Sequence, residues 1–336
     1  MLKQLTGRNV QKGSLYHFFS ENVAEKVWAL FQPLWRDFML AIKQLSKKFG
    51  SLQALKDVSF TVQTGEIMGL IGQNGAGKST TFHSILGFLK YAGKISWHDQ
   101  PITEAVFDEI GYLPEERSLM PKLTVEQQIV YLARLKNKSA KEIRPQIDDW
   151  LAKFVVKGKR TDKIKDLSKG NQQKIQLICT LIHRPKLLIL DEPFSGLDPV
   201  NVDLLEQAIF EAKKQGAAII FSSHDMGNVT ALCDRLIMLK AGQVVLNGRV
   251  DDVREQFGKN HLFVTTDWSQ ERLAQLPQVV KVTQLAARRF LLQLADPAAG
   301  PEIFRQLTQG QYIEEFSQQA PTLDEIFRMK VGEQDA

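Results

Sequence analysis

The fold is decided by the stretch Gly72-Gln73-Asn74-Gly75-Ala76-Gly77-Lys78-Ser79-Thr80, which has the pattern of a phosphate-binding loop. An apolar run over residues 67–71 precedes it as a predicted strand, and residues 80–89 continue it as a predicted helix. The glycines let the backbone curl until successive N–H groups face phosphate oxygens. Lys78 then supplies a positive charge for the outer phosphates, and the hydroxyl of Ser79 becomes a ligand for Mg²⁺. The predicted nucleotide-binding residues of this loop are Gly72, Asn74, Gly75, Ala76, Gly77, Lys78, Ser79 and Thr80.

A second stretch, Leu187-Leu188-Ile189-Leu190-Asp191-Glu192-Pro193, joins four aliphatic residues to two carboxylates. A strand that is apolar on both faces belongs in the middle of a parallel sheet, and phosphate loops lie at the carboxyl edge of such sheets. Asp191 is therefore predicted to hold the water shell of the metal, and Glu192 to act as general base for the attacking water. The alternative is a core strand that ends in an ordinary charged turn, which the upstream loop disfavours.

Composition excludes several classes of protein. The 336 residues carry 43 Lys and Arg against 38 Asp and Glu, and a net charge of +5 is too small to indicate nucleic-acid binding. Cys179 and Cys233 lack the spacing of a metal site, which favours a reducing compartment. No apolar run reaches the roughly 20 residues that a membrane-spanning helix needs.

Short apolar runs alternate with helical patterns from residue 40 to residue 258, which predicts an α/β domain around a mostly parallel sheet. Residues from about 120 to 170 lack a strand pattern and predict a helical subdomain, with helices at 124–135 and 140–154.

The two ends of the chain differ from this domain. Residues 259–336 have the order β-α-β-β-α-β, with the last strand at 312–316, and predict a small α+β domain of ferredoxin-like type. Residues 1–39 form an N-terminal extension with two open alternatives, an unstructured segment or an amphipathic helix on a membrane surface.

A third motif, Leu167-Ser168-Lys169-Gly170-Asn171-Gln172-Gln173, lies between the phosphate loop and the carboxylates. With them it resembles the signature loop of the ABC transporter ATPases, a family of P-loop NTPases, and the resemblance covers residues 41–250. In that family the loop caps the ATP held by the opposite subunit, which implies nucleotide contacts for Ser168, Gly170 and Asn171. A hydroxyl, a backbone amide and a helix dipole are suited to a γ-phosphate. The alternative is an ordinary capped helix start.

Three further positions match the family in order. Ser195-Gly196-Leu197-Asp198 resembles the loop that crosses the dimer interface, and His224 resembles the switch histidine that touches the γ-phosphate. Phe49 resembles the aromatic residue on which adenine stacks, with a core phenylalanine as the alternative. The implied catalytic residues are Lys78, Glu192 and His224.

The sequence also departs from the family pattern. Glu115 stands where most members have a glutamine at the metal and the coupling loop, which gives a predicted metal set of Ser79, Asp191 and Glu115. Lys169 and Asn171 replace the more usual Gly and Gln. These departures occur together with the C-terminal motif Pro321-Thr322-Leu323-Asp324-Glu325-Ile326-Phe327. In both respects the chain resembles a bacterial subgroup of ABC ATPases that serves exporters, similar to sodium-extrusion and ABC-2-type systems. Members of that subgroup carry a short C-terminal domain.

The resemblance implies an ATPase that binds ATP and Mg²⁺ and works as a homodimer or with a paired ATPase subunit. It implies integral membrane permease subunits as partners, a peripheral position on the cytoplasmic face of the membrane through them, and no nucleic-acid partner. The alternative is a non-transport ABC ATPase that acts on ribosomes or DNA. Against it, ribosome-acting relatives usually join two such domains in one chain, and DNA-repair relatives insert long coiled coils.

Overall fold

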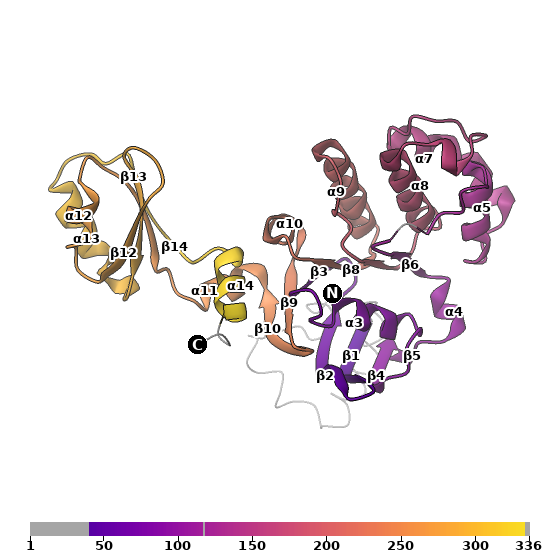
Figure 1. Cartoon of the computed structure of the whole chain (residues 1–336), viewed down its shortest axis with the longest axis horizontal. Helices are drawn as coiled ribbons and strands as arrows, with labels where there is room; N and C mark the ends of the chain where they lie inside the picture. The colour runs from indigo at the N-terminus through magenta and orange to yellow at the C-terminus, as the bar shows by residue number, and fades with distance from the viewer. Residues whose placement is uncertain (1–39, 117, 333–336) are drawn as a thin grey trace, which may run out of the picture. The chain divides into compact units, whose positions relative to one another are not determined.

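The computed structural model describes residues 40–116 and 118–332, which Figure 1 traces along the chain. The N-terminal extension expected over residues 1–39 lies outside the described residues, as do both alternatives for it. The described part contains three sheets and the helices from α3 to α14. None of the helices in this part is both long and apolar enough to cross a membrane.

A six-stranded sheet carries the phosphate loop and the two carboxylates, in the order β10-β9-β3-β8-β7-β6. Neighbouring strands are parallel from β9 to β6, and β10 runs antiparallel to β9. Its strands are β3 (Ile67–Ile71), β6 (Ile110–Leu113), β7 (Leu187–Leu190), β8 (Ala218–Ser223), β9 (Arg235–Lys240) and β10 (Gln243–Arg249). The α/β fold predicted from the alternating pattern is confirmed.

A second sheet is antiparallel, with the order β2-β1-β4-β5. Its strands are β1 (Leu40–Phe49), β2 (Leu52–Val62), β4 (Ala92–Trp97) and β5 (Gln100–Pro101). β1 and β2 form a hairpin in which Phe49 pairs with Leu52 at the turn. The sequence pattern did not separate these strands from the parallel sheet, because both kinds of strand begin as short apolar runs.

The two faces of the parallel sheet are buried against different layers. Ile67 and Ile71 of β3 enter a core shared with α5, α8, α9 and α10, while Met68 and Leu70 enter a core shared with α3 and the antiparallel sheet. This period of two is what a strand buried on both faces requires. The helices of these layers are α3 (Lys78–Ile85), α5 (Val125–Arg134), α8 (Lys169–Leu181), α9 (Pro199–Lys214) and α10 (Met226–Leu232).

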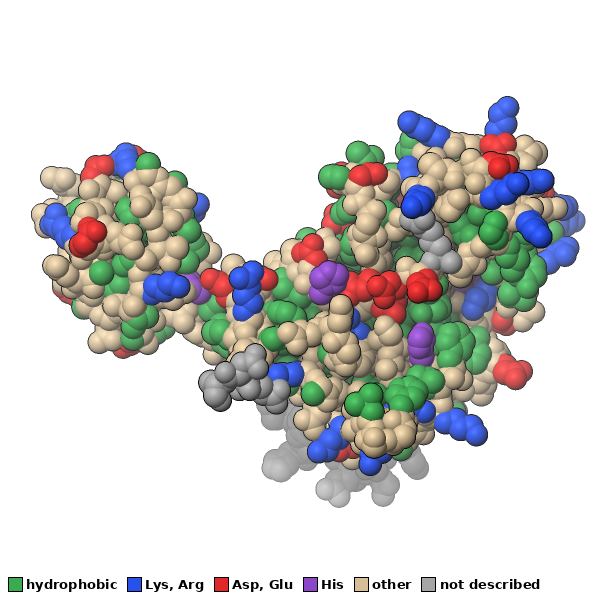
Figure 2. Space-filling view, in the orientation of Figure 1, with side chains coloured by type: hydrophobic (Ala, Val, Ile, Leu, Met, Phe, Trp, Pro, Cys, Tyr) green, Lys and Arg blue, Asp and Glu red, His purple; other side chains and the backbone are tan. Residues whose placement is uncertain are grey.

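The helical insert consists of α5, α6 (Ala140–Ile143) and α7 (Ile147–Lys153). The single helix predicted over residues 140–154 is wrong, because a 3-10 turn at Arg144–Gln146 divides it. Pro145 causes this break, since proline cannot donate the backbone hydrogen bond of a continuous α-helix. Figure 2 shows Lys and Arg side chains gathered over the insert, and some of them are paired: Arg160 contacts Glu126 at 2.9 Å.

A C-terminal domain follows α11 (Val250–Glu255) and contains an antiparallel sheet of order β12-β13-β11-β14. Its elements are β11 (His261–Thr265), α12 (Gln270–Leu273), β12 (Val279–Gln284), β13 (Arg289–Leu294), α13 (Gly300–Thr308) and β14 (Glu315–Gln319). The last strand was predicted at 312–316 and begins three positions later. Its place follows from pairing with β11, which sets Thr265 opposite Glu315 and His261 opposite Gln319.

The last helix, α14 (Leu323–Gly332), does not belong to the core of that C-terminal sheet. Leu323 and Ile326 join the same core as Val229 and Leu232 of α10. Lys240 of β9 donates hydrogen bonds from Nζ to the carbonyls of the last turn of α14, at 2.6 and 3.1 Å. The chain therefore leaves the core of the parallel sheet after α11, forms the C-terminal sheet, and returns to that core.

Candidate active site

The phosphate-binding loop joins β3 to α3 at the carboxyl edge of the parallel sheet. Gly77 precedes the helix with φ at +108°, a conformation that favours glycine, and its side-chain position is closed because a Cβ there would lie 2.9 Å from the Ala54 carbonyl oxygen. No side chain caps the start of α3. The first backbone N–H groups of this helix are thus available to an anion, as a phosphate site requires.

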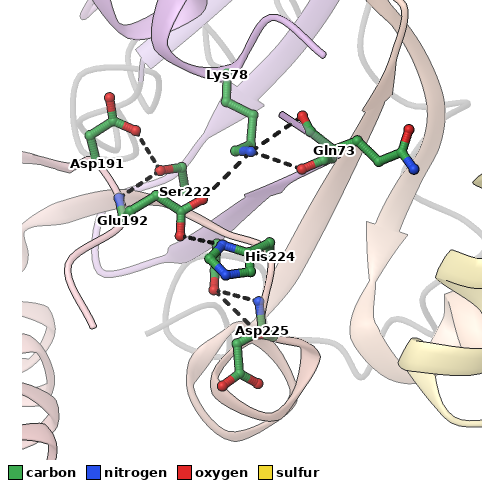
Figure 3. Close-up of polar contacts among 9 residues, drawn as sticks. Gln73, Lys78, Asp191, Glu192, Ser222, His224 and Asp225 are labelled. Carbon is green, nitrogen blue, oxygen red and sulfur yellow. Dashed lines mark hydrogen bonds and ion pairs between the residues drawn. The ribbon is translucent and has the colours of Figure 1, made fainter. Parts of the chain in front are cut away.

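Lys78, the first residue of α3, is held inside the site. Its side chain is 7% exposed, and Nζ donates hydrogen bonds to the carbonyls of Gly72 at 2.8 Å and Gln73 at 3.5 Å. The same Nζ lies 3.5 Å from Oε1 of Glu192, as an ion pair without a hydrogen bond (Figure 3). The ammonium group therefore faces both the loop and the predicted base.

The two carboxylates that follow β7 are positioned by the neighbouring strand β8. Asp191 is 4% exposed, and its Oδ1 accepts a hydrogen bond of 2.6 Å from the hydroxyl of Ser222. The backbone N–H of Glu192 donates to the same hydroxyl at 2.8 Å. Glu192 has φ at +47°, an uncommon conformation for a residue with a side chain, and this turn directs its carboxylate toward Lys78.

His224 lies just past the end of β8, and its side chain is 65% exposed. Its Nδ1 stands 2.9 Å from Oε2 of Glu192. Figure 2 shows acidic side chains beside a histidine on this face of the molecule. The three predicted catalytic residues, Lys78, Glu192 and His224, are thus connected by direct contacts.

The residues present fit Mg²⁺. No group of three or more His, Cys, Asp or Glu in the described part forms a closed metal cluster. Mg²⁺ bound with a nucleotide does not need one, because it keeps several waters and takes one or two protein oxygens beside the phosphates. Ser79 on the first turn of α3 and Asp191 beyond β7 offer a hydroxyl and a carboxylate of this kind.

Glu115 lies in the turn after β6 and is exposed. Its connection to the site is electrostatic. Tyr112 is half-buried, and this burial, with the charges of Asp191 and Glu115, raises the pKa of Tyr112 to about 12. Glu115 and Asp191 therefore act on one common neighbour, although no hydrogen bond among the described residues joins Glu115 to Asp191 or Ser79.

The signature-like loop forms a capped helix start. Ser168 is the N-cap of α8, and its hydroxyl accepts hydrogen bonds from the backbone N–H of Asn171 at 3.3 Å and from the Asn171 side chain at 2.9 Å. α8 starts at Lys169, directly after the motif's serine, because this cap satisfies its first turn. Ser168 and Lys169 are exposed, and among the described residues no hydrogen bond or ion pair joins this loop to Lys78 of the same chain.

Phe49 at the end of β1 is 45% exposed, unlike a core phenylalanine. The ammonium of Lys47 lies 4.7 Å from the centre of its ring. An exposed aromatic face on a hairpin is available for stacking.

The sequence did not single out Ser222 as a functional residue, yet it contacts both carboxylate residues. The sequence nevertheless contains a signal for Ser222. Residues 218–221 are apolar and buried like β7, so the first hydroxyl after them must lie beside the first residues after β7, because the strands are parallel neighbours.

Comparison with known proteins decides the family. Residues 55–195 match the family model described as ABC transporter. Residues 248–331 match the model described as ATP-binding protein DrrA1-3-like, C-terminal domain. The chain is 42% identical over 295 residues to the ABC transporter ATP-binding protein YhaQ of Bacillus subtilis, covering 88% of this chain and 99% of that protein. The chain belongs to the ABC transporter ATP-binding proteins. As such it is an ATPase, the ATP-binding subunit that energises a transporter complex with membrane subunits.

Other relatives agree with this family. An ABC transporter ATP-binding protein of Alkalihalophilus pseudofirmus is 44% identical over 264 residues, which cover 78% of this chain and 98% of that protein. A solved structure described as the ATP binding subunit of an ABC transporter superposes with a TM-score of 0.62 at 34% identity, covering 66% of this chain and 93% of that one. The resemblance inferred from the motifs is confirmed.

Proposed function

We propose that this ABC ATPase hydrolyses MgATP at the carboxyl edge of its parallel sheet and thereby energises export through separate membrane subunits. The observation that supports the reaction is the line of contacts from Lys78 through Glu192 to His224. These contacts bring together in one site an ammonium group that can bind phosphate, a carboxylate that can accept a proton from water, and an imidazole.

Each residue has a proposed role. When ATP binds, the ammonium group of Lys78 donates hydrogen bonds to the outer phosphates in place of the loop carbonyls. The backbone N–H groups at the uncapped start of α3 bind the phosphate oxygens. Ser79, Asp191 and Glu115 form the proposed metal set, and Mg²⁺, when bound, neutralises charge on the phosphates. Glu192 removes the proton of the attacking water, and His224 contacts the γ-phosphate from the exposed end of β8.

We propose that Ser168, Gly170 and Asn171 serve the nucleotide of a second ATPase subunit, in a homodimer or a paired assembly. Two observations support a ligand from another chain. Ser168 and Lys169 are exposed, and a cation on the first turn of a helix is disfavoured by the helix dipole unless an anion lies near it. Phe49, exposed on the hairpin, is proposed to stack on adenine.

We also propose residues 40–258 as the ATPase domain, with its helical subdomain at about 120–170, and residues 259–336 as an accessory domain. Within the latter, the sheet over residues 261–319 has its own core, while α14 packs into the core of the ATPase domain. The strand order β12-β13-β11-β14, in which β13 separates β11 from β12, supports a ferredoxin-like arrangement for the accessory domain. Its match to the DrrA1-3-like C-terminal domain supports export. A position on the cytoplasmic face, attached through membrane permease subunits, follows from that role.

Nucleotide binding by Lys78→Ala tests the site. The substitution removes the charge that faces the phosphates, and loss of a charge-assisted contact should weaken ATP binding by about 10- to 100-fold. Lys94→Ala is the matched control, since Lys94 is an exposed lysine on β4. Binding is measured by titration calorimetry with ATP and Mg²⁺, and near-parent affinity of Lys78→Ala would remove Lys78 from the site.

A further inference from the structure

Ser222 is the one side chain that contacts both carboxylate residues of the site in the described part of the chain. β7 and β8 are parallel neighbours with Leu190 opposite Phe221, and β8 continues two residues beyond that pair. The register therefore places Ser222 beside the point where the chain turns away from the sheet at Asp191 and Glu192. Ser222 is fully buried, so water does not compete for its hydroxyl.

The hydroxyl of Ser222 has a single orientation in this setting. It has one proton to donate, and the 2.6 Å contact with Oδ1 of Asp191 commits that proton, because an ionised carboxylate can only accept. The 2.8 Å contact with the Glu192 N–H then uses an oxygen lone pair. One buried hydroxyl thus links the side chain of Asp191 to the backbone of Glu192, as Figure 3 shows.

Both links act on groups that need a fixed direction. Glu192 has a left-handed backbone at φ +47°, which is strained for glutamate and persists only where the surroundings hold it. The hydrogen bonds at its N–H, to Ser222, and at its carbonyl, from the Ser195 N–H at 3.1 Å, hold this turn. The contact at Oδ1 of Asp191 leaves Oδ2 as the oxygen to face the water shell of a metal.

We infer that Ser222 is a positioning residue for ATP hydrolysis, which fixes the direction of the Asp191 carboxylate toward Mg²⁺ and that of the Glu192 carboxylate toward water. This inference rests on the proposed roles of Asp191 and Glu192. Ser222 itself touches neither nucleotide nor metal, so its removal acts on turnover and metal affinity and spares the binding of ATP without metal.

The test compares Ser222→Ala, Ser222→Thr and the control Ser84→Ala in the full-length protein. Ser84 is also buried and donates a 2.8 Å hydrogen bond, but to the Thr80 carbonyl of its own helix. For Ser222→Ala we expect kcat to fall about tenfold and the Mn²⁺ concentration for half-saturation, followed by electron paramagnetic resonance with ADP, to rise about threefold. ATP affinity in the presence of EDTA should stay within about twofold. Ser222→Thr, which keeps the hydroxyl, should recover most of the Mn²⁺ affinity.

Three outcomes overturn the inference. One is a Ser222→Ala protein with parent kcat and parent Mn²⁺ affinity. A second is an equal loss in Ser84→Ala, which would show a general effect of a buried serine. The third is a Ser222→Thr protein that is folded by circular dichroism yet matches Ser222→Ala in Mn²⁺ affinity. Glu192→Gln in the same assay separates the proposals, because a normal rate for that variant contradicts the proposed base, whatever Ser222 does.

Discussion

The imidazole of His224 contacts the carboxylate of Glu192, with Nδ1 2.9 Å from Oε2, although the two residues are 32 positions apart in the chain. The contact assigns Nδ1 as the donor, because the carboxylate can only accept. His224 can then donate a hydrogen bond to a phosphate as well only through a proton on Nε2. The pair thus connects the proposed base to the residue proposed to touch the γ-phosphate.

His224→Ala should lower turnover about 100-fold and leave ATP affinity within about threefold, because the imidazole is proposed to act on the reacting phosphate and to contribute little to ground-state binding. Steady-state phosphate release and calorimetric ATP binding measure the two quantities. His83→Ala, which removes a half-buried histidine of α3, is the control. A variant with the parent rate would show that the contact with Glu192 has no part in hydrolysis.

Glu115→Gln should raise the Mg²⁺ concentration for half-maximal hydrolysis about two- to fivefold. The change removes one exposed negative charge, which like that of Asp191 acts on Tyr112, at nearly constant shape, and exposed charge contacts are worth up to about 1 kcal/mol. Glu104→Gln, an exposed glutamate on α4 (Glu104–Phe107), is the matched control. An unchanged Mg²⁺ titration would exclude Glu115 from the metal set.

The return of α14 to the core predicts different results for two deletions of the C-terminal domain. Truncation after Gly258 removes Leu323 and Ile326 from the core, and should lower the free energy of unfolding by about 3–6 kcal/mol. Excision of residues 260–319 with a short Gly-Ser linker keeps α14. Such a linker is feasible because His261 pairs with Gln319 across neighbouring strands, and Gln318 bonds the Lys259 carbonyl at 2.8 Å.

Urea unfolding and ATP binding of both deletion proteins check this prediction. The excised protein should bind ATP with parent affinity, since the proposed catalytic residues all precede α11. Equal destabilisation of the two proteins would show that α14 does not stabilise the ATPase core.

His183 predicts an acid-dependent loss of stability. The residue follows α8, is buried, and contacts the Ile110 carbonyl through Nε2 at 3.3 Å. Burial is the main cause that lowers the pKa of His183 to about 4. Between pH 6.5 and pH 4 the imidazole is therefore protonated in the unfolded chain but neutral in the folded chain. The contribution of His183 to the free energy of unfolding is complete above about pH 6.5 and falls by up to about 3 kcal/mol toward pH 4.

His183→Gln checks the cause of that loss. Glutamine can donate to the same carbonyl without titrating, so its free energy of unfolding should change little between pH 6.5 and pH 4.5. The parent protein should lose stability over the same interval in urea unfolding experiments. The same slope in both proteins would assign the acid sensitivity to other groups.

The sequence predicts most of what lies along a single strand or loop. β3 at Ile67–Ile71 begins and ends where its apolar run does, and Lys78, Glu192 and His224, which their motifs predict as catalytic, lie in direct contact. The features that the sequence does not predict depend on pairing between distant segments. The position of β14 is set by its register with β11. No sequence pattern in α14 predicts that it packs into the same core as α10. Ser222 belongs to the same class, because its role comes from the alignment of β8 with β7.

The most direct measurement is ATP turnover and assembly of Glu192→Gln in the presence of Mg²⁺, with Glu104→Gln as control. Because the change removes the proposed base and keeps the shape of the site, turnover should fall at least about 100-fold while ATP binding stays within a few-fold. The protein should then accumulate as an ATP-bound dimer, visible by light scattering. Hydrolysis at the parent rate would contradict the assignment of Glu192 as the base and, with it, the proposed site.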